Sequence, residues 1–356
     1  MIDFTSSLYL AMKHGSSELN SWQQLTTGVP AILSEPYLAK LIAQQVADMQ
    51  GLESGIVAPS TLHLYWDLFG YLRELPIAIF IDEHIYPVSR YGIERLQRGN
   101  ILVRTFGHFN AGSLDEVIKK TIPKGVAPYV LTDGYCPFCG IGAPIDKYLS
   151  IIKPYKGRII IDDTQAFGIL GQLKNNRSPY GCGGGGSLKW KGINDGSIVT
   201  IISLAKAFGV PMSVLSGESR FVDAFKDKSE TRINSSPTSN AHLQAASHAI
   251  RLNRLQGDQR RNKLWHNVLT LKKHLRKKGI FLQGGVFPVQ HTNLNPHRTF
   301  ELFKKLKKND IKTALVVPHK GQRPAVSFII RYDHSIEEIL RLVDCIAKVE
   351  RIYQFN

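Results

Sequence analysis

Residues 197–210 read SIVTIISLAKAFGV, and the apolar run followed by a lysine in this stretch indicates the class of fold. Its segment 198–202 is almost wholly apolar, which is typical of a strand buried on both faces of a sheet. Lys206 follows at the end of that strand. A lysine that is desolvated at a strand end has a lowered pKa, and its amine can act as a nucleophile. The stretch therefore predicts a buried sheet with a reactive amine at its edge.

The sequence on either side of this stretch alternates between predicted strands and helices. A mainly parallel sheet with helices on both faces follows from this alternation, so we expect a three-layer α/β fold. Such sheets bind ligands at the carboxyl ends of their strands. Strands are predicted over 77–82, 101–106, 127–134, 158–164, 197–206 and 212–217, and helices over 35–50 and 59–72.

The pattern changes after about residue 240, where a long helix is predicted over 239–278. A smaller α+β domain is expected to follow, with strands over 286–292, 313–318 and 325–333 and helices over 297–308 and 335–353. We therefore divide the chain into an N-terminal segment (1–34) that packs with the small domain, a large cofactor-binding domain (35–245) and a small C-terminal domain (246–356). The glycine-rich residues 181–186 predict a mobile loop.

The composition is that of an ordinary soluble globular protein, with 43% hydrophobic and 21% charged residues among 356. Its apolar runs have strand length and its N-terminus lacks the features of a signal peptide, so we expect no membrane span and a cytoplasmic location. The net charge of +16 comes mostly from residues after 250. These basic residues form either solvated helix faces or a surface for an anionic partner. Nucleic acid is the partner least expected, because no recognition motif accompanies the charge.

Two of the four cysteines, Cys136 and Cys139, form one C-x-x-C motif. A structural zinc site requires a second pair of ligands at a suitable spacing. Cys182 has no spacing that supports this role. The sequence alone therefore favours reduced, packed thiols and no metal.

A second charged group ends another predicted strand, since Asp162 and Asp163 follow the apolar residues 159–161. Pyridoxal phosphate requires a lysine for its aldehyde and an acidic partner for its pyridine nitrogen. Asp162 and Lys206, on two different strands, would supply both. A buried aspartate–lysine ion pair explains the same spacing.

Two segments show a specific resemblance to a known family. RIIIDDTQAFGILG (158–171) resembles the (V/I)DDAHGTGVIG segment of the α-oxoamine synthases, which are fold type I pyridoxal-phosphate enzymes, and SLAKAFGV (203–210) resembles their T-x-G/S-K-A/G-F-G segment. The similarity runs from about residue 35 to 350. Looser similarity is found in 79–100, 106–118, 130–145 and 233–250.

The resemblance implies a role for each matching residue. Lys206 is implied as the cofactor lysine and Asp162 as the partner of the pyridine nitrogen. Tyr86 stands where the family has a ring-stacking histidine, and Gln165 where the family has the histidine of its DDAH motif. Gln165 can hydrogen-bond the cofactor but cannot act as an acid or base near neutral pH. Asp133 matches an acidic residue beside the cofactor.

The phosphate of the cofactor has its own implied partners. Ser203 stands where the family has a phosphate-binding hydroxyl, and Ser60 and Thr61 begin a helix whose N-terminus would face the phosphate. Asn234, Ser235 and Ser236 match a segment through which the neighbouring subunit reaches the phosphate. The resemblance therefore implies a homodimer with shared active sites.

One departure concerns the carboxylate of the substrate. The synthases hold it with the arginine of an LR(I/L)T motif, where this chain has Ser327. Arg331 lies four residues further on, about 13 Å along a strand. Arg331 is thus no simple replacement, and Arg323 or a shift in register would be needed instead.

The resemblance and its departures leave three functions open. The first is decarboxylative condensation of an amino acid with an acyl thioester, whose acyl carrier would be coenzyme A or an acidic carrier protein. The second is an aminotransferase acting on an amine, an amino sugar, an aldehyde or a ketone. The third is a non-catalytic binding module, against which the presence of both Asp162 and Lys206 counts.

Overall fold

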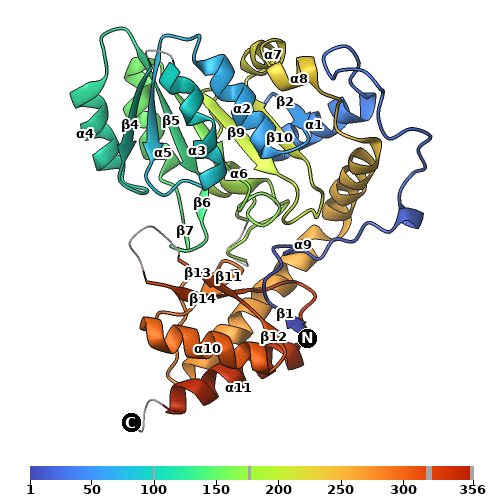
Figure 1. The fold of residues 1–356 in the computed structure, drawn as a ribbon, viewed down its shortest axis with the longest axis vertical. Coiled ribbons are helices and arrows are strands. Elements are labelled where there is room, and N and C mark those ends of the chain that lie inside the picture. The colour runs from blue at the N-terminus through green and yellow to red at the C-terminus, as the bar shows by residue number, and fades with distance from the viewer. Residues whose placement is uncertain (99–100, 175–177, 318–322, 353–356) are drawn as a thin grey trace.

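The computed structural model describes residues 1–98, 101–174, 178–317 and 323–352. Its centre is a seven-stranded sheet in the order β2-β10-β9-β8-β5-β3-β4, in which β10 alone is antiparallel to both of its neighbours (Figure 1). The α/β fold with a mainly parallel sheet is therefore confirmed. Its strands are β2 (Ser54–Ala58), β3 (Ile77–Asp82), β4 (Leu102–Phe106), β5 (Ala127–Asp133), β8 (Arg158–Asp162), β9 (Ile198–Ser203) and β10 (Ser213–Gly217).

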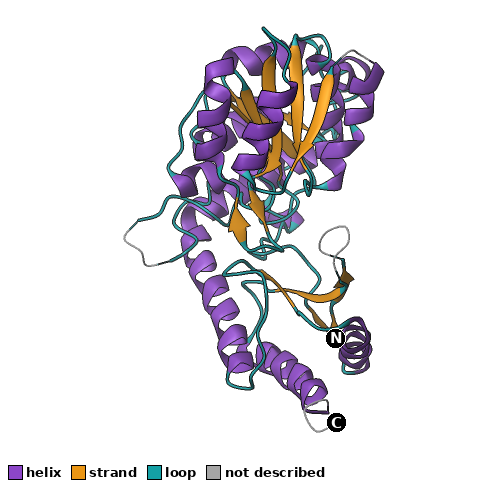
Figure 2. Cartoon of the chain, turned by 90° about the vertical axis from the view of Figure 1, so that its left-hand side faces the viewer, coloured by secondary structure: helices purple, strands orange, loops and turns teal. Residues whose placement is uncertain are grey.

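Helices cover both faces of this sheet (Figure 2). On β3, Ile79 and Ile81 pack toward α2 and α7, whereas Ala78 and Phe80 pack toward α4 and α5. Double-sided burial explains why these strands read as continuous apolar runs. The helices of this part are α1 (Tyr37–Gln50), α2 (Thr61–Leu72), α3 (Pro87–Tyr91), α4 (Ala111–Thr121), α5 (Ile145–Ile152), α6 (Gly186–Lys191), α7 (Ser219–Asp227) and α8 (Glu230–Asn234).

The 37-residue helix α9 (Asn240–Arg276) runs from the side of the large sheet to the C-terminal elements (Figure 1). These elements comprise a three-stranded antiparallel sheet in the order β11-β14-β13, packed with two helices. They are β11 (Val289–His291), β13 (Ala314–Val316), β14 (Ala325–Ile329), α10 (Pro296–Lys308) and α11 (Ile336–Ile352).

The N-terminal residues lie beside these C-terminal elements. Strand β1 (Ile2–Asp3) pairs in parallel with β12 (Ile311–Lys312). Phe4 is buried, and its carbonyl accepts a hydrogen bond of 2.7 Å from the amide of Ile329 in β14. The first residues of the chain are thus fixed by contacts with its last third.

Parts of this fold differ from the sequence prediction or were absent from it. Strand β2, at one edge of the large sheet, was not predicted. Strands β8 and β9 end at Asp162 and Ser203, earlier than predicted. Residues 181–186 are packed rather than open, since the amide of Gly168 donates to the carbonyl of Gly184. Among the described helices, none combines the length and the apolar character needed to cross a membrane.

Candidate active site

A cavity of about 270 Å³ lies beside the carboxyl ends of the neighbouring strands β5 and β8. Five of the residues predicted from the sequence line it: Tyr86, Asp133, Asp162, Gln165 and Lys206. They come from four separate segments of the chain. The remaining lining residues are His84, Pro87, Cys136, Pro137, Phe138 and Thr164.

Asp162 is buried at the last position of β8. The hydroxyl of Tyr65 donates to its Oδ2 at 3.0 Å, and the amide of Thr164 donates to its Oδ1 at 3.1 Å. Both carboxylate oxygens are therefore satisfied by donors, which fixes the orientation of the group. Burial, together with the Asp162 carboxylate, holds the pKa of Tyr65 well above its usual range, so this phenol remains a donor.

Asp133 lies opposite Asp162 in the register of β5 and β8. Burial, and then the charge of Asp162, raise the pKa of Asp133 well above that of an exposed aspartate. The amide of Tyr86 donates to Asp133 Oδ1 at 3.3 Å. Two carboxyl groups with unequal surroundings therefore face the same cavity, and Asp133 keeps its proton to a higher pH than an exposed aspartate does.

Lys206 follows β9, and its Nζ lies 5.3 Å from the centre of the Tyr86 ring. Burial lowers the pKa of Lys206, although the carboxyl groups of Asp162 and Asp133 oppose that shift. A larger fraction of this amine is consequently neutral at a given pH than for a lysine in water. A neutral amine is the nucleophilic form.

Gln165 is oriented by a residue from the far N-terminus. The buried Tyr9 donates its hydroxyl to Gln165 Oε1 at 2.8 Å. Sequence reasoning missed both Tyr9 and Tyr65. Tyr65 lies one helical turn after Thr61 in α2, so the sequence could have predicted that both residues are on the same face of this helix. The sequence carries no signal for Tyr9.

The sequence model of the family named aminotransferase class I and II matches residues 78–344, which is most of the chain. The chain belongs to this family. An 8-amino-7-oxononanoate synthase from Coprothermobacter proteolyticus is 26% identical over 74% of this chain, and the match spans 64% of that protein, less than two thirds of its length. A synthase of the same name from Lysinibacillus sphaericus is 23% identical over 86% of this chain and 76% of its own.

Solved structures agree with the fold. Serine palmitoyltransferase from Sphingomonas wittichii superposes with a TM-score of 0.85 at 15% identity, covering 99% of this chain and 88% of that one. An 8-amino-7-oxononanoate synthase from Francisella tularensis gives 0.74 at 19% identity, covering 100% and 99%. The fold type I architecture and the resemblance to the α-oxoamine synthases are thus confirmed.

Three residues implied for phosphate binding, Ser60, Thr61 and Ser203, are not among the residues that line the Lys206 cavity. Ser60 precedes α2, and its Oγ lies 2.8 Å from Nδ1 of His63. Thr61 is the first residue of that helix. Ser203 is connected to the cavity indirectly, because its amide donates to Oγ1 of Thr164 at 3.0 Å.

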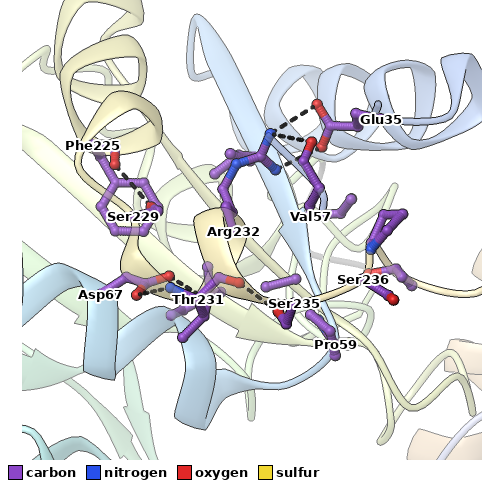
Figure 3. A pocket seen from close by; sticks show the side chains of 16 residues that line it. Glu35, Val57, Pro59, Asp67, Phe225, Ser229, Thr231, Arg232, Ser235 and Ser236 are labelled. Carbon is purple, nitrogen blue, oxygen red and sulfur yellow. Dashed lines mark hydrogen bonds and ion pairs between the residues drawn. The ribbon is translucent and has the colours of Figure 1, made fainter. Parts of the chain in front are cut away.

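Ser235 lies at a different place, beside a pocket of only about 20 Å³ (Figure 3). Asn234 ends α8, and Ser235 and Ser236 follow it along this pocket. An ion pair between Arg232 Nη1 and Glu35 Oε1, 2.9 Å apart, closes one side. These residues are therefore not brought to the Lys206 cavity of their own chain.

No arginine of the described residues lines the Lys206 cavity. Arg331, which follows β14, donates from Nε to Oδ1 of Asp333 at 2.8 Å. Ser327 is buried within β14, and Arg323 is exposed. The two arginines considered from the sequence are thus absent from the lining of the Lys206 cavity.

Proposed function

We propose that this chain is a pyridoxal-phosphate-dependent transferase that condenses an amino acid with the acyl group of a thioester and releases carbon dioxide. The observation that carries the proposal is the pairing of Lys206 with a fixed, buried Asp162 at one cavity. The names of the related synthases support the condensation, as does the α-oxoamine synthase resemblance of the segments around these two residues.

The residues at the cavity fit pyridoxal phosphate. Lys206 supplies an amine whose pKa is lowered by burial, and Asp162 supplies a carboxylate with both oxygens hydrogen-bonded. The half-exposed ring of Tyr86 offers an aromatic surface beside the amine. When bound, pyridoxal phosphate accepts electrons from the α-carbon of an amine substrate.

Each residue has a distinct task in this proposal. Lys206 would hold the cofactor through Nζ and, once released, would carry the substrate's α-proton. Asp162 would be the partner that keeps the pyridine nitrogen protonated, and the hydrogen bond from Tyr65 prevents its carboxylate from turning away. Gln165, oriented by Tyr9, would donate an amide hydrogen to the cofactor.

The acyl carrier is proposed to be anionic, either coenzyme A or an acidic carrier protein. A broad basic hollow on α9 supports this choice, because Lys272, Lys273, Arg276 and Lys277 line it. We further propose a homodimer in which Ser235 contacts the phosphate in the neighbouring subunit. The location of Ser235 supports this arrangement, since Ser235 lines a separate pocket and not the Lys206 cavity of its own chain.

Transamination is the second candidate. The observation that favours it is the lack of a described arginine at the cavity, where a substrate carboxylate would require a fork of donors. Gln165 also favours transamination. A glutamine cannot transfer a proton near neutral pH, and transamination does not require it to, because Lys206 carries the proton. An amine, amino sugar or aldehyde without a carboxylate would then be the substrate.

The cofactor is tested first, by adding pyridoxal phosphate to the purified protein and reducing with borohydride. We expect covalent attachment at Lys206, located by peptide mass. Lys206→Ala should abolish the attachment, and Lys147→Ala, which changes an exposed lysine, should retain it. Equal labelling of both variants would contradict the proposal.

The two reactions are then separated by a screen of amines against acyl thioesters and, in separate samples, against oxo acids. Condensation releases a thiol and carbon dioxide together. Transamination releases neither, converts the amine into a carbonyl compound and passes its amino group by way of the cofactor to the oxo acid. Release of both products only when Lys206 is present supports condensation. Carbonyl formation without thiol release supports transamination.

A further inference from the structure

The C-x-x-C motif lies in a small hairpin on the wall of the Lys206 cavity. Strands β6 (Tyr135–Cys136) and β7 (Ile141–Gly142) are antiparallel, and Cys136 lies opposite Ile141. Cys136 is buried and lines the cavity, while Cys139 is exposed. The motif is thus outside the cofactor machinery proposed above but directly adjacent to it.

The backbone of this hairpin turns the two sulfur atoms toward each other. The amide of Cys139 donates to Sγ of Cys136 at 3.3 Å, and the amide of Gly140 donates to the carbonyl of Cys136 at 2.9 Å. Gly140 has a φ of +72°, which residues with a Cβ adopt reluctantly. Cysteine binds metals as the thiolate.

A third ligand comes from a distant segment. His108 lies between β4 and α4, and its ring nitrogen and the two cysteine sulfurs all lie within 4.8 Å of one another. Nδ1 of His108 is 2.7 Å from Oδ1 of the fully buried Asp82. Asp82 is itself held by the amides of His84 (2.9 Å) and Phe109 (3.0 Å).

This arrangement directs Nε2 of His108 to the cysteines. A carboxylate that binds one ring nitrogen of a histidine fixes the tautomer and the orientation of the ring, and metal-binding histidines in proteins commonly have such a partner. Two thiolates and one imidazole form a soft donor set that prefers Zn²⁺ to Mg²⁺ or Ca²⁺. The sequence favoured packed thiols because a second ligand pair was missing, and the fold supplies His108 in its place.

We propose that Cys136, Cys139 and His108 form a binding site for a thiophilic divalent cation, Zn²⁺ first among them. Binding forms bonds from the cation to the two Sγ atoms and to Nε2, and the protons of the two thiols are released to solvent. A tetrahedral ion with three protein ligands keeps one position for water or for an oxygen of a bound molecule.

The cation would join three segments around the cavity. It would tie the β6–β7 hairpin to the loop before α4 and, through Asp82, to the end of β3. Phe138 lies between the two cysteines and lines the cavity, so its position would be fixed as well. The metal would thereby set the shape of one wall of the site, and the proposal holds whether or not the chain is a condensing transferase.

The test uses the full chain without an affinity tag, reduced and freed of metal with a chelator under anaerobic conditions, and titrated with Co²⁺. We expect about one Co²⁺ per chain, with thiolate-to-cobalt charge-transfer bands that added Zn²⁺ removes. Cys139→Ser alters an exposed side chain, so the variant should fold and lose the bands. Cys182→Ser and Cys345→Ser, whose thiols lie outside the cluster, should retain them.

A positioning role of Asp82 is tested in the same titration. Asp82→Asn should weaken Co²⁺ binding by roughly 10- to 100-fold while leaving the bands in place. Three results would overturn the metal site. They are a reduced protein that binds no Co²⁺, binding without charge-transfer bands, and bands that persist in Cys139→Ser. If the protein isolated in air carries a Cys136–Cys139 disulfide and, once reduced, binds no Co²⁺, the pair is a redox pair instead.

Discussion

Asp162 and Asp133 end neighbouring strands, and their surroundings give them different properties. Asp162 receives hydrogen bonds from Tyr65 and Thr164, whereas Asp133 receives a longer one, 3.3 Å, from the amide of Tyr86. Donors stabilise an ionised carboxylate, and a nearby negative charge destabilises one. Asp133 therefore keeps its proton to a higher pH than an exposed aspartate does, beside the hydrogen-bonded carboxyl group of Asp162.

Tyr65→Phe tests whether the phenol holds Asp162 in place. The variant keeps the ring, which stacks on Phe69, and loses only the hydroxyl that donates to the carboxylate. Hydrogen bonds to charged groups contribute about 1.5–3 kcal/mol, so pyridoxal phosphate should bind roughly ten-fold or more weakly. Absorption titration with the cofactor measures this. Tyr71→Phe on the same helix is the control, and an equal loss in both variants would remove Tyr65 from the site.

Asp163 gives a prediction about pH and stability. Burial raises its pKa to about 7, and the hydrogen bond from the Ser187 amide to Oδ2, 2.9 Å, only partly offsets this. Between about pH 4 and pH 7 the folded protein keeps a proton that the unfolded chain has already lost. The contribution of Asp163 to the free energy of unfolding should therefore decrease as the pH rises through this window and then level off.

Asp163→Asn should remove this pH dependence, because the amide carries no charge and still accepts the Ser187 hydrogen bond through its oxygen. Relative to the wild type, the variant should gain up to a few kcal/mol between about pH 5 and about pH 8, at about 1.4 kcal/mol per pKa unit. Urea unfolding at both pH values measures the gain. Parallel pH dependence in the two proteins would show that Asp163 is ionised throughout.

At the scale of elements, the glycine-rich residues 181–186 form a packed connection rather than the mobile loop predicted from composition. The amide of Gly183 donates to Asp258 Oδ1 at 2.9 Å, and its carbonyl accepts from Asn253 Nδ2 at 3.0 Å, so the segment is docked on α9. Glycine is needed here for close approach as much as for conformation. A Cβ on Gly186, which begins α6, would lie 2.0 Å from Oδ2 of Asp163.

Gly186→Ala and Gly192→Ala separate these two effects. Both glycines have positive φ, +87° and +66°, so both substitutions cost roughly 1–2 kcal/mol of backbone strain. A Cβ at Gly192 meets nothing within 4 Å, whereas one at Gly186 overlaps with Asp163. Gly186→Ala should thus be destabilised by at least about 1–3 kcal/mol more in urea unfolding. Equal losses would mean that the Asp163 side chain moves away at little cost.

At the scale of the whole molecule, α9 connects the large sheet to the C-terminal elements, and the fully buried Arg261 fixes it. Its Nη1 donates to the carbonyl of Gly168 at 2.9 Å and to Oδ1 of Asn253 at 2.8 Å, while Nη2 donates to Oδ1 of Asp258 at 2.6 Å. Gly168 lies just after Gln165. The helix therefore supports the segment that carries a cavity residue.

Arg261→Ala should destabilise the protein by about 3–5 kcal/mol, since it leaves buried acceptors without their donors. Arg254→Ala, at an exposed position of the same helix, should change the free energy of unfolding by less than about 0.5 kcal/mol. Chemical denaturation measures both. A small effect at Arg261 would indicate that water replaces the guanidinium in the space between α9 and Gly168.

The sequence prediction was accurate for features that are determined by a short stretch of neighbouring residues and less accurate for the others. Strand β3 was predicted with its observed bounds, Ile77–Asp82, because a strand buried on both faces requires a continuous apolar run. Strand β2, SGIVA, was missed because it is short and its first two residues are only half-buried. Lys206 and Asp162 were located because both a strand end and a resemblance marked them.

The sequence by itself determined the fold class, the family resemblance and five of the residues that line the cavity, because strand ends and motif blocks are short stretches of chain. Only the tertiary structure brought Tyr9 to Gln165, Tyr65 to Asp162 and His108 to the cysteine pair. These contacts join segments that are distant along the chain. Their geometry depends on how sheets and helices pack, and no local pattern of residues encodes that packing.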